Sequence, residues 1–142
     1  MVGGQCIDLQ SEGGQVDFPL LQAMDQGKTV ALISAACQLG CIAAGAGEDA
    51  LSHARQYAQG VGMAFQIRDD ILDVLGDAKT LGKNVGMDSA HDKRNYVSLL
   101  GVDKAQALVE SYTEEAQRAL DAFSGDTTFL RELARSLVAR NK

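Results

Sequence analysis

The stretch EDALSHARQYAQGVGMAFQIRDDILDVL, residues 48–75, is the longest helical pattern of the chain and decides the fold. A second apolar stripe, Met63, Ile67 and Val74, lies roughly opposite a first one. A helix that is apolar on two sides is normally buried, so we predict a central helix that packs on both faces. The residues of the first stripe recur at steps of three, four or seven along the helix: Leu51, Ala54, Ala58, Val61, Phe65, Leu72 and Leu75.

Four polar side chains, Gln66, Asp69, Asp70 and Asp73, lie between these two stripes. Because both flanking stripes are apolar, we expect the polar strip to face a cavity or cleft inside the protein. Asp69 and Asp73 are one helical turn apart, about 6 Å along the axis, so their carboxylates can address a shared site. Oxygen ligands at this spacing suit Mg²⁺, which typically bridges to substrate phosphates. An acidic cluster on a helix is also often a solvated surface, and that alternative stays open here.

The composition of the whole chain also favours helices, with one proline and only 5% aromatic residues. Residues that favour helices therefore dominate, and we predict an all-α fold. The first nine residues resemble the tail of a helix, and Asp17 can cap the next one. Gly76-Asp77 is expected to end the central helix. Further helices are predicted over residues 18–26, 28–44, 95–100, 103–123 and 128–140.

The length of 142 residues and the net charge of −6 limit the class of protein. The length suits a single all-helical domain over residues 1–142. The negative charge repels nucleic acid and anionic membranes, so we expect no nucleic-acid partner. No apolar run approaches the roughly 20 residues of a membrane span, and the first residues do not have the pattern of a signal peptide. We therefore expect a cytoplasmic protein.

Cys37 and Cys41 are spaced to share one helix face, where they could in principle bind zinc. Only His53 and His91 are available elsewhere as histidine ligands, and they complete no obvious tetrahedral site. The alternative is that both cysteines are small buried apolar residues. A disulfide framework is not expected from three cysteines in a chain with no export signal.

Several lysines accompany the polar strip elsewhere in the sequence; its three aspartates are called the acidic strip below. Lys28-Thr29 is expected to open a helix, whose N-terminus favours anions, and Lys83 and Lys93 lie in a polar, glycine-containing connection. Acidic residues for a metal together with lysines for phosphate are the composition of a magnesium–diphosphate site.

Taken together, these motifs resemble the trans-type isoprenyl diphosphate synthases, especially the bacterial short-chain farnesyl and geranylgeranyl diphosphate synthases. The resemblance implies antiparallel helices that form the C-terminal half of an isoprenoid-synthase-type helical bundle. The matching residues cover nearly the whole chain: Gly4-Gln5-Cys6-Ile7-Asp8-Leu9, Lys28-Thr29, Phe65-Gln66, Asp69-Asp70-Ile71-Leu72-Asp73, Gly76-Asp77, Leu81-Gly82-Lys83, Gly86, Asp88, Lys93, Tyr96 and Leu100-Gly101.

The resemblance also implies roles for individual residues. Asp69 is similar to the family's metal-ligating aspartate, and Asp70 and Asp73 to residues that support the Mg²⁺ and its water shell. Lys28 resembles a ligand of the allylic diphosphate, and Thr29 a residue whose oxygen faces the carbocation. Gln66 resembles a second residue whose oxygen faces the carbocation. Lys83 and Lys93 resemble further ligands of the diphosphate.

The implied reaction is the condensation of isopentenyl diphosphate with an allylic diphosphate, and the complete enzyme is expected to be a homodimer. The chain departs from the family pattern because no second DDxxD motif precedes Asp69, and the basic cluster for isopentenyl diphosphate is also missing. It therefore resembles the C-terminal half alone, and we expect the isolated chain to be inactive. One alternative is a non-catalytic helical module that keeps a partial magnesium–diphosphate site or binds a partner. A terpene cyclase is a further alternative, since it shares the acidic motif.

Overall fold

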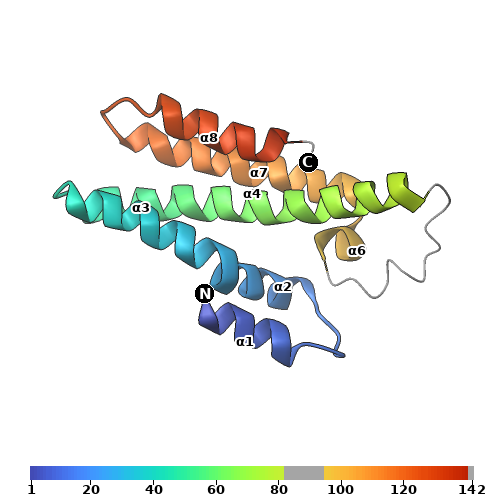
Figure 1. The fold of residues 1–142 in the computed structure, drawn as a ribbon. Coiled ribbons are helices and arrows are strands. Elements are labelled where there is room, and N and C mark those ends of the chain that lie inside the picture. Colours follow the sequence, from blue (N-terminus) through green and yellow to red (C-terminus); the bar gives the residue numbers. More distant parts are fainter. Residues whose placement is uncertain (82–94, 141–142) are drawn as a thin grey trace.

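A computed structural model of the chain describes residues 1–81 and 95–140, and within these residues every regular element is a helix. The all-α prediction is therefore confirmed. In Figure 1 the longer helices lie side by side and run roughly parallel or antiparallel to one another. They are α1 (Val2–Gln10), α2 (Phe18–Asp25), the π-helix η1 (Gln26–Val30), α3 (Ala31–Ala43), α4 (Glu48–Leu81), α6 (Tyr96–Leu100), α7 (Val102–Ala119), the 3₁₀-helix η2 (Leu120–Ala122) and α8 (Thr128–Ala139).

Helix α4 is the centre of the molecule. Helix α7 packs along one side of it, and α3 and η1 pack along the other (Figure 1). Apolar side chains from these helices form two buried clusters around α4. One cluster consists of Leu21, Val30, Met63, Ala64, Ile67, Ile71, Tyr96, Ala105 and Val109. The other consists of Tyr57, Val61, Ala116, Ala119, Leu120 and Ala134.

The two predicted stripes of α4 are buried along its middle and not at its far end. Ala58 and Met63, one from each stripe, are fully buried. Leu75 was predicted as core and is instead 45% exposed. The reason is that Leu75 lies beyond the clusters in which α4 meets its neighbours. The stripes therefore predict the buried faces of α4 correctly only where a second helix covers them.

Two predicted helix boundaries are wrong. Helix α4 does not end at Gly76-Asp77 and continues to Leu81, because a single glycine lowers helical stability by only about 1 kcal/mol and does not oblige the chain to turn. The predicted break before Lys28 is also absent. The backbone is helical on both sides of η1, so α2, η1 and α3 form one continuous helical segment. Lys28 therefore does not lie at a helix N-terminus.

Other predicted boundaries are confirmed within one to four residues. Asp17 caps α2, since its Oδ1 accepts a hydrogen bond of 3.0 Å from the amide of Leu20. Asn95 caps the short helix α6, and Gly101 ends it with a φ of 84°. Glycine is suited to this positive φ because it has no side chain to clash.

Glycines allow helix α1 to cross η1 at very short range. A Cβ atom added at Gly4 would lie 2.2 Å from the backbone nitrogen of Lys28, and one added at Gly27 would lie 2.8 Å from the Cα of Gly4. Only residues without a side chain fit at this crossing. The crossing places α1 directly against the π-helical turn that carries Lys28 and Thr29.

None of the described helices combines the length and the apolar character that a membrane-spanning segment needs.

Candidate functional site

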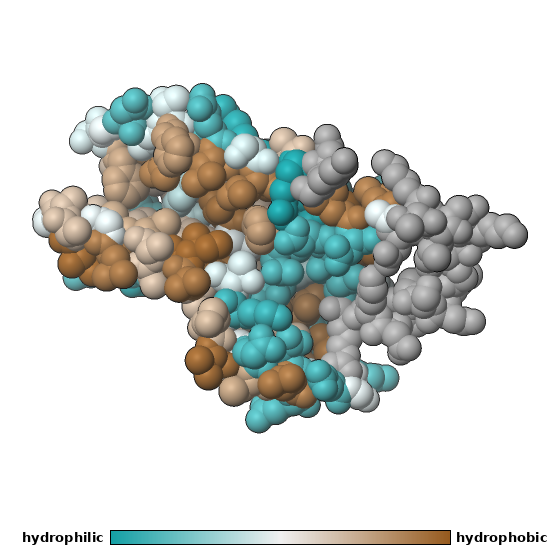
Figure 2. Space-filling model, in the orientation of Figure 1, coloured by the Kyte–Doolittle hydropathy of each residue, from teal (hydrophilic) through white to brown (hydrophobic). Residues whose placement is uncertain are grey.

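The polar strip of α4 meets η1 and α6 near the middle of the molecule. Thr29 on η1 donates a hydrogen bond of 3.0 Å from its Oγ1 to Oε1 of Gln66 on α4. The amide of Tyr96, at the start of α6, donates a hydrogen bond of 2.9 Å to Oδ2 of Asp70. The structure therefore brings together Thr29 and Gln66, which the sequence analysis placed in one site. In Figure 2 a hydrophilic band crosses this part of the surface, whereas hydrophobic surface lies over α3.

Asp70 is partly buried, as is Asp69. Its pKa is raised to about 7, mainly by burial and also by the negative charges of Asp25, Asp73 and Asp69, and the hydrogen bond from the Tyr96 amide acts in the opposite direction. A carboxyl group in this environment is short of compensating positive charge. A cation bound nearby would favour its ionised form.

Asp69 forms a salt bridge with Arg140, at the end of α8. The sequence predicts Asp69 as a metal ligand. In the structure its carboxylate is paired with an arginine that lies 71 residues further along the chain. Burial raises the pKa of Asp69, and the positive charge of Arg140 acts in the opposite direction. Asp73, one turn further along α4, is exposed. The three carboxylates therefore have three different environments.

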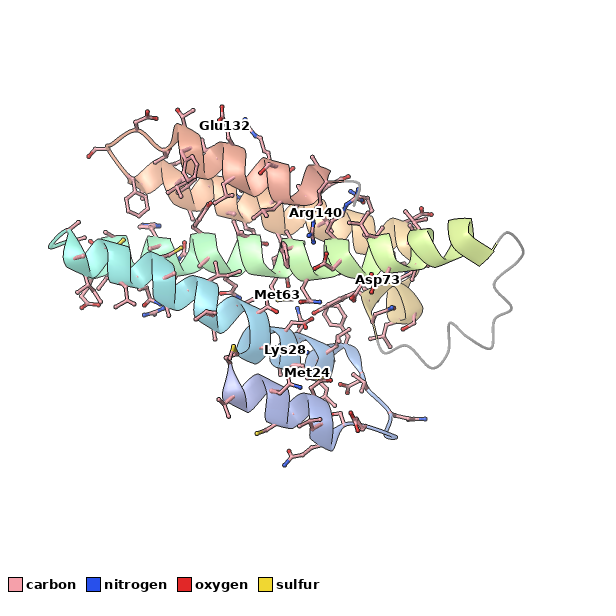
Figure 3. The ribbon with its side chains drawn as sticks, viewed as in Figure 1. Met24, Lys28, Met63, Asp73, Glu132 and Arg140 are labelled. Carbon is pink, nitrogen blue, oxygen red and sulfur yellow. The ribbon has the colours of Figure 1, made fainter. Side chains whose placement is uncertain are left out.

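Lys28 is ion-paired with Asp8 of α1, with 3.0 Å between Nζ and Oδ2. Both side chains are partly exposed, so the pair adds little to stability, and a lysine held this way can exchange its partner for another anion. In Figure 3, Lys28 and Arg140 lie on opposite sides of α4, and Asp73 lies further along that helix. Lys83 and Lys93, the other predicted diphosphate ligands, lie outside the described residues.

Asp25, the last residue of α2, was not singled out by the sequence analysis. It is only 7% exposed, and burial raises its pKa to about 6. Tyr96 is completely buried beside it, and interaction with the Tyr96 side chain lowers the pKa of Asp25, although the effect of burial is larger. The available sequence signal was an acidic residue in the apolar helix FPLLQAMD, three positions before Lys28.

The described residues contain no cluster of three or more His, Cys, Asp or Glu side chains that could chelate a metal by themselves. This arrangement is compatible with Mg²⁺, which binds to proteins through one or two carboxylates and completes its shell with water and substrate phosphates. Asp69 and Asp70 provide oxygen donors of the right kind, and Asp70 has no ion pair with a cationic side chain among the described residues. The residues therefore fit the ion.

Cys37 and Cys41 are half-buried and line an apolar groove of about 510 Å³ together with residues of α4 and of the turn before α8. Burial raises the pKa of the Cys37 thiol, which disfavours the thiolate that zinc requires. The apolar alternative therefore describes these cysteines better than a zinc site.

Comparisons with known proteins agree in one family. Residues 1–124 match the family model described as polyprenyl synthetase. The farnesyl diphosphate synthase of Escherichia coli (strain K12) is 42% identical over 146 residues, covering 100% of this chain and 49% of that protein. The farnesyl diphosphate synthase of Bacillus subtilis (strain 168) is 36% identical, covering 99% of this chain and 48% of that protein. The chain thus spans about half the length of these relatives.

Solved structures give the same result for the fold. The crystal structure of an FPP/GFPP synthase from Zymomonas mobilis superimposes with a TM-score of 0.82 at 34% identity, covering 97% of this chain and 45% of that one. A geranyltransferase from Helicobacter pylori, solved in complex with magnesium and isoprenyl diphosphate, superimposes with a TM-score of 0.71 at 29% identity. That match covers 97% of this chain and 45% of the Helicobacter protein.

Proposed function

The chain belongs to the polyprenyl synthetase family, and we propose that it supplies one half of a trans-prenyltransferase, the half that carries a DDxxD motif. The complete enzyme would join isopentenyl diphosphate to an allylic diphosphate and release a longer prenyl diphosphate and inorganic diphosphate. The observation that carries this proposal is the meeting of η1 with α4. Where they meet, Thr29 is hydrogen-bonded to Gln66 of the polar strip, and Lys28 directly precedes Thr29 on η1.

In this proposal Asp69 is the principal ligand of Mg²⁺, and Asp70 and Asp73 support the ion and its water shell. When bound, the ion supplies positive charge that stabilises the departing diphosphate. The ammonium group of Lys28 binds the same diphosphate, exchanging its contact with Asp8 for a phosphate oxygen. Lys83 and Lys93 have the same proposed role.

Thr29 and Gln66 act on the allylic carbon and not on the departing diphosphate. The allylic carbon–oxygen bond breaks, its electron pair leaves with the diphosphate, and the carbon becomes positive. The oxygen dipoles of Thr29 and Gln66 then stabilise the cation without bonding to it, because neither is a strong nucleophile. The double bond of isopentenyl diphosphate attacks the cation, and loss of a proton restores a neutral hydrocarbon chain.

A chimera tests this proposal directly. The matching half of the E. coli farnesyl diphosphate synthase is replaced by this chain, and Mg²⁺-dependent condensation of isopentenyl and dimethylallyl diphosphates is measured. We expect condensation by the chimera, at least a 100-fold loss with Asp69→Ala, and none by the isolated 142-residue chain. A well-folded chimera with full activity after Asp69→Ala would contradict the assignment.

The same experiment separates the alternatives. A non-catalytic module would bind pyrophosphate with Mg²⁺ but give an inactive chimera, and a terpene cyclase would yield a cyclic hydrocarbon.

On the family resemblance, we also propose that the complete enzyme is a cytoplasmic homodimer. We further propose that residues 1–142 form one helical unit within a larger synthase domain.

A further inference from the structure

Three residues of α4 contact Arg140, the residue that follows α8. Asp69 forms a salt bridge with its guanidinium group. The ring of Phe65 lies beneath that group, with 4.1 Å between the guanidinium carbon and the ring centroid. Arg68 donates a hydrogen bond of 3.0 Å from Nη2 to the backbone carbonyl of Arg140. A charge contact, a stacking contact and a backbone contact therefore hold one residue on the acidic strip.

These contacts form a defined docking site rather than a loose surface pair. The side chain of Arg140 is 27% exposed and that of Asp69 36%, so water screens the pair only in part. Stacking on Phe65 fixes the plane of the guanidinium group, which a planar arginine favours. Arg68 is itself held by Gln106 of α7, at 3.3 Å from Nη1 to Oε1, so the docked residue is tied to two helices.

We propose that Arg140 is a built-in competitor for the divalent cation at Asp69, so that binding of the metal requires release of this residue, which directly follows α8. This inference rests on the proposed function, in which Asp69 is the principal metal ligand. The guanidinium group bonds to Oδ1 of Asp69, one of the two oxygens that this carboxylate can offer to a metal. A guanidinium group and a divalent cation cannot both occupy the same side of that oxygen.

Competition at one carboxylate has a reciprocal consequence. If docked Arg140 lowers the metal affinity by some factor, the bound metal weakens docking of Arg140 by the same factor. Docking of the end of α8 on α4 therefore depends on whether the site holds metal. If the backbone of Arg140 moves together with its side chain, Arg68 also loses its contact to the Arg140 carbonyl, and the change extends to the α4–α7 interface through Gln106.

The test uses Mn²⁺, whose paramagnetic resonance signal is lost on binding, as a probe for the metal site of the 142-residue chain. We expect Arg140→Gln to tighten Mn²⁺ binding by roughly fivefold or more, a typical size for coupling between two sites. Arg135→Gln is the matched control, because it removes the same charge from an exposed residue of α8 that has no ion pair among the described residues. The Mn²⁺ affinity of the Arg135→Gln variant should stay within about twofold of that of the parent chain, as expected for a screened surface charge.

Two further measurements complete the test. Asp69→Asn should abolish binding in both the parent chain and the Arg140→Gln chain. Hydrogen exchange over residues 133–140 should become faster when metal is added to the parent chain. Loss of binding with Asp69→Asn but unchanged affinity with Arg140→Gln would overturn the competition and leave the proposed function intact. Unchanged binding with Asp69→Asn would instead overturn the metal assignment, and with it this inference.

Discussion

At the residue scale, the site consists of carboxyl groups whose burial is only partly offset. Asp25 and Asp70 have pKa values raised to about 6 and about 7, with burial as the largest cause for both. Asp69 is the exception, because Arg140 provides a positive charge at short range. A strip that holds such groups without full compensation is less stable than an apolar core and more responsive to added cations.

These raised pKa values predict how stability depends on pH. A carboxyl group whose pKa is higher in the folded state keeps its proton longer than in the unfolded state, so the unfolded state binds fewer protons between about pH 4 and 7. Stability should therefore fall as pH rises through this window. We expect the midpoint of thermal unfolding to be higher at pH 5 than at pH 8, as measured by circular dichroism without added metal.

A substitution at Asp25 separates this effect from the general acidity of the chain. Asp25→Asn removes the buried charge, so it should raise the unfolding midpoint at pH 8 by at least about 2 °C, which corresponds to roughly 1 kcal/mol. Glu132→Gln on the exposed surface of α8 is the control for loss of one negative charge. An equal gain in both variants would mean that net charge, and not burial of Asp25, sets the pH dependence.

At the element scale, close packing of helices positions the site. Helix α1 crosses η1 through Gly4 and Gly27, and α4 approaches its neighbours through Gly60 and Gly62. A Cβ atom at Gly60 would lie 2.5 Å from the carbonyl oxygen of Tyr112 on α7. The π-helical turn η1 lies at the α1 crossing and carries both Lys28 and Thr29. Irregular π-turns are common at functional sites, which agrees with this placement.

The α1–η1 crossing gives a sharp prediction for two matched glycines. Gly4→Ala would place a methyl group 2.2 Å from a backbone nitrogen, so α1 must move away and the free energy of unfolding should fall by about 3 kcal/mol or more. Gly40→Ala is the control, because its methyl group meets no atom within 4 Å on the exposed part of α3. It should stabilise the chain by up to about 1 kcal/mol through helix propensity. Urea unfolding measures both, and equal effects would contradict the crossing.

Sequence periodicity predicted the helices well because burial against a neighbour leaves a regular apolar stripe, as Ala58 and Met63 on α4 illustrate. It could not predict that the helix passes through Gly27 without a break, since the contact with Gly4 that stabilises this turn is tertiary. The partnership of Asp69 with Arg140 was also beyond local patterns, because no spacing rule connects residues 71 positions apart. The Thr29–Gln66 pair was found only through the family resemblance.

At the scale of the whole molecule, the chain forms only one side of a helical bundle. Helix α3 has no helix on its outer face among the described residues, and Leu32, Leu39 and Ile42 are each more than half exposed there. Figure 2 shows this hydrophobic surface over α3. Exposed apolar patches of this kind mark surfaces that pack against other protein. The chain spans about half the length of its relatives from Escherichia coli and Bacillus subtilis.

This face leads to a prediction about association. The isolated chain should self-associate in sedimentation velocity at micromolar concentration, because pairing of the α3 faces removes Leu32 and Leu39 from water at roughly 25 cal/mol for each Å² of apolar surface buried. Leu32→Gln with Leu39→Gln should shift the distribution toward monomer. Phe129→Gln, which removes an even more exposed apolar residue from α8, should leave association unchanged. A parent chain that sediments as a monomer would contradict the prediction. If Phe129→Gln shifted the distribution toward monomer as strongly as the two leucine substitutions do, the associating surface would not be the α3 face.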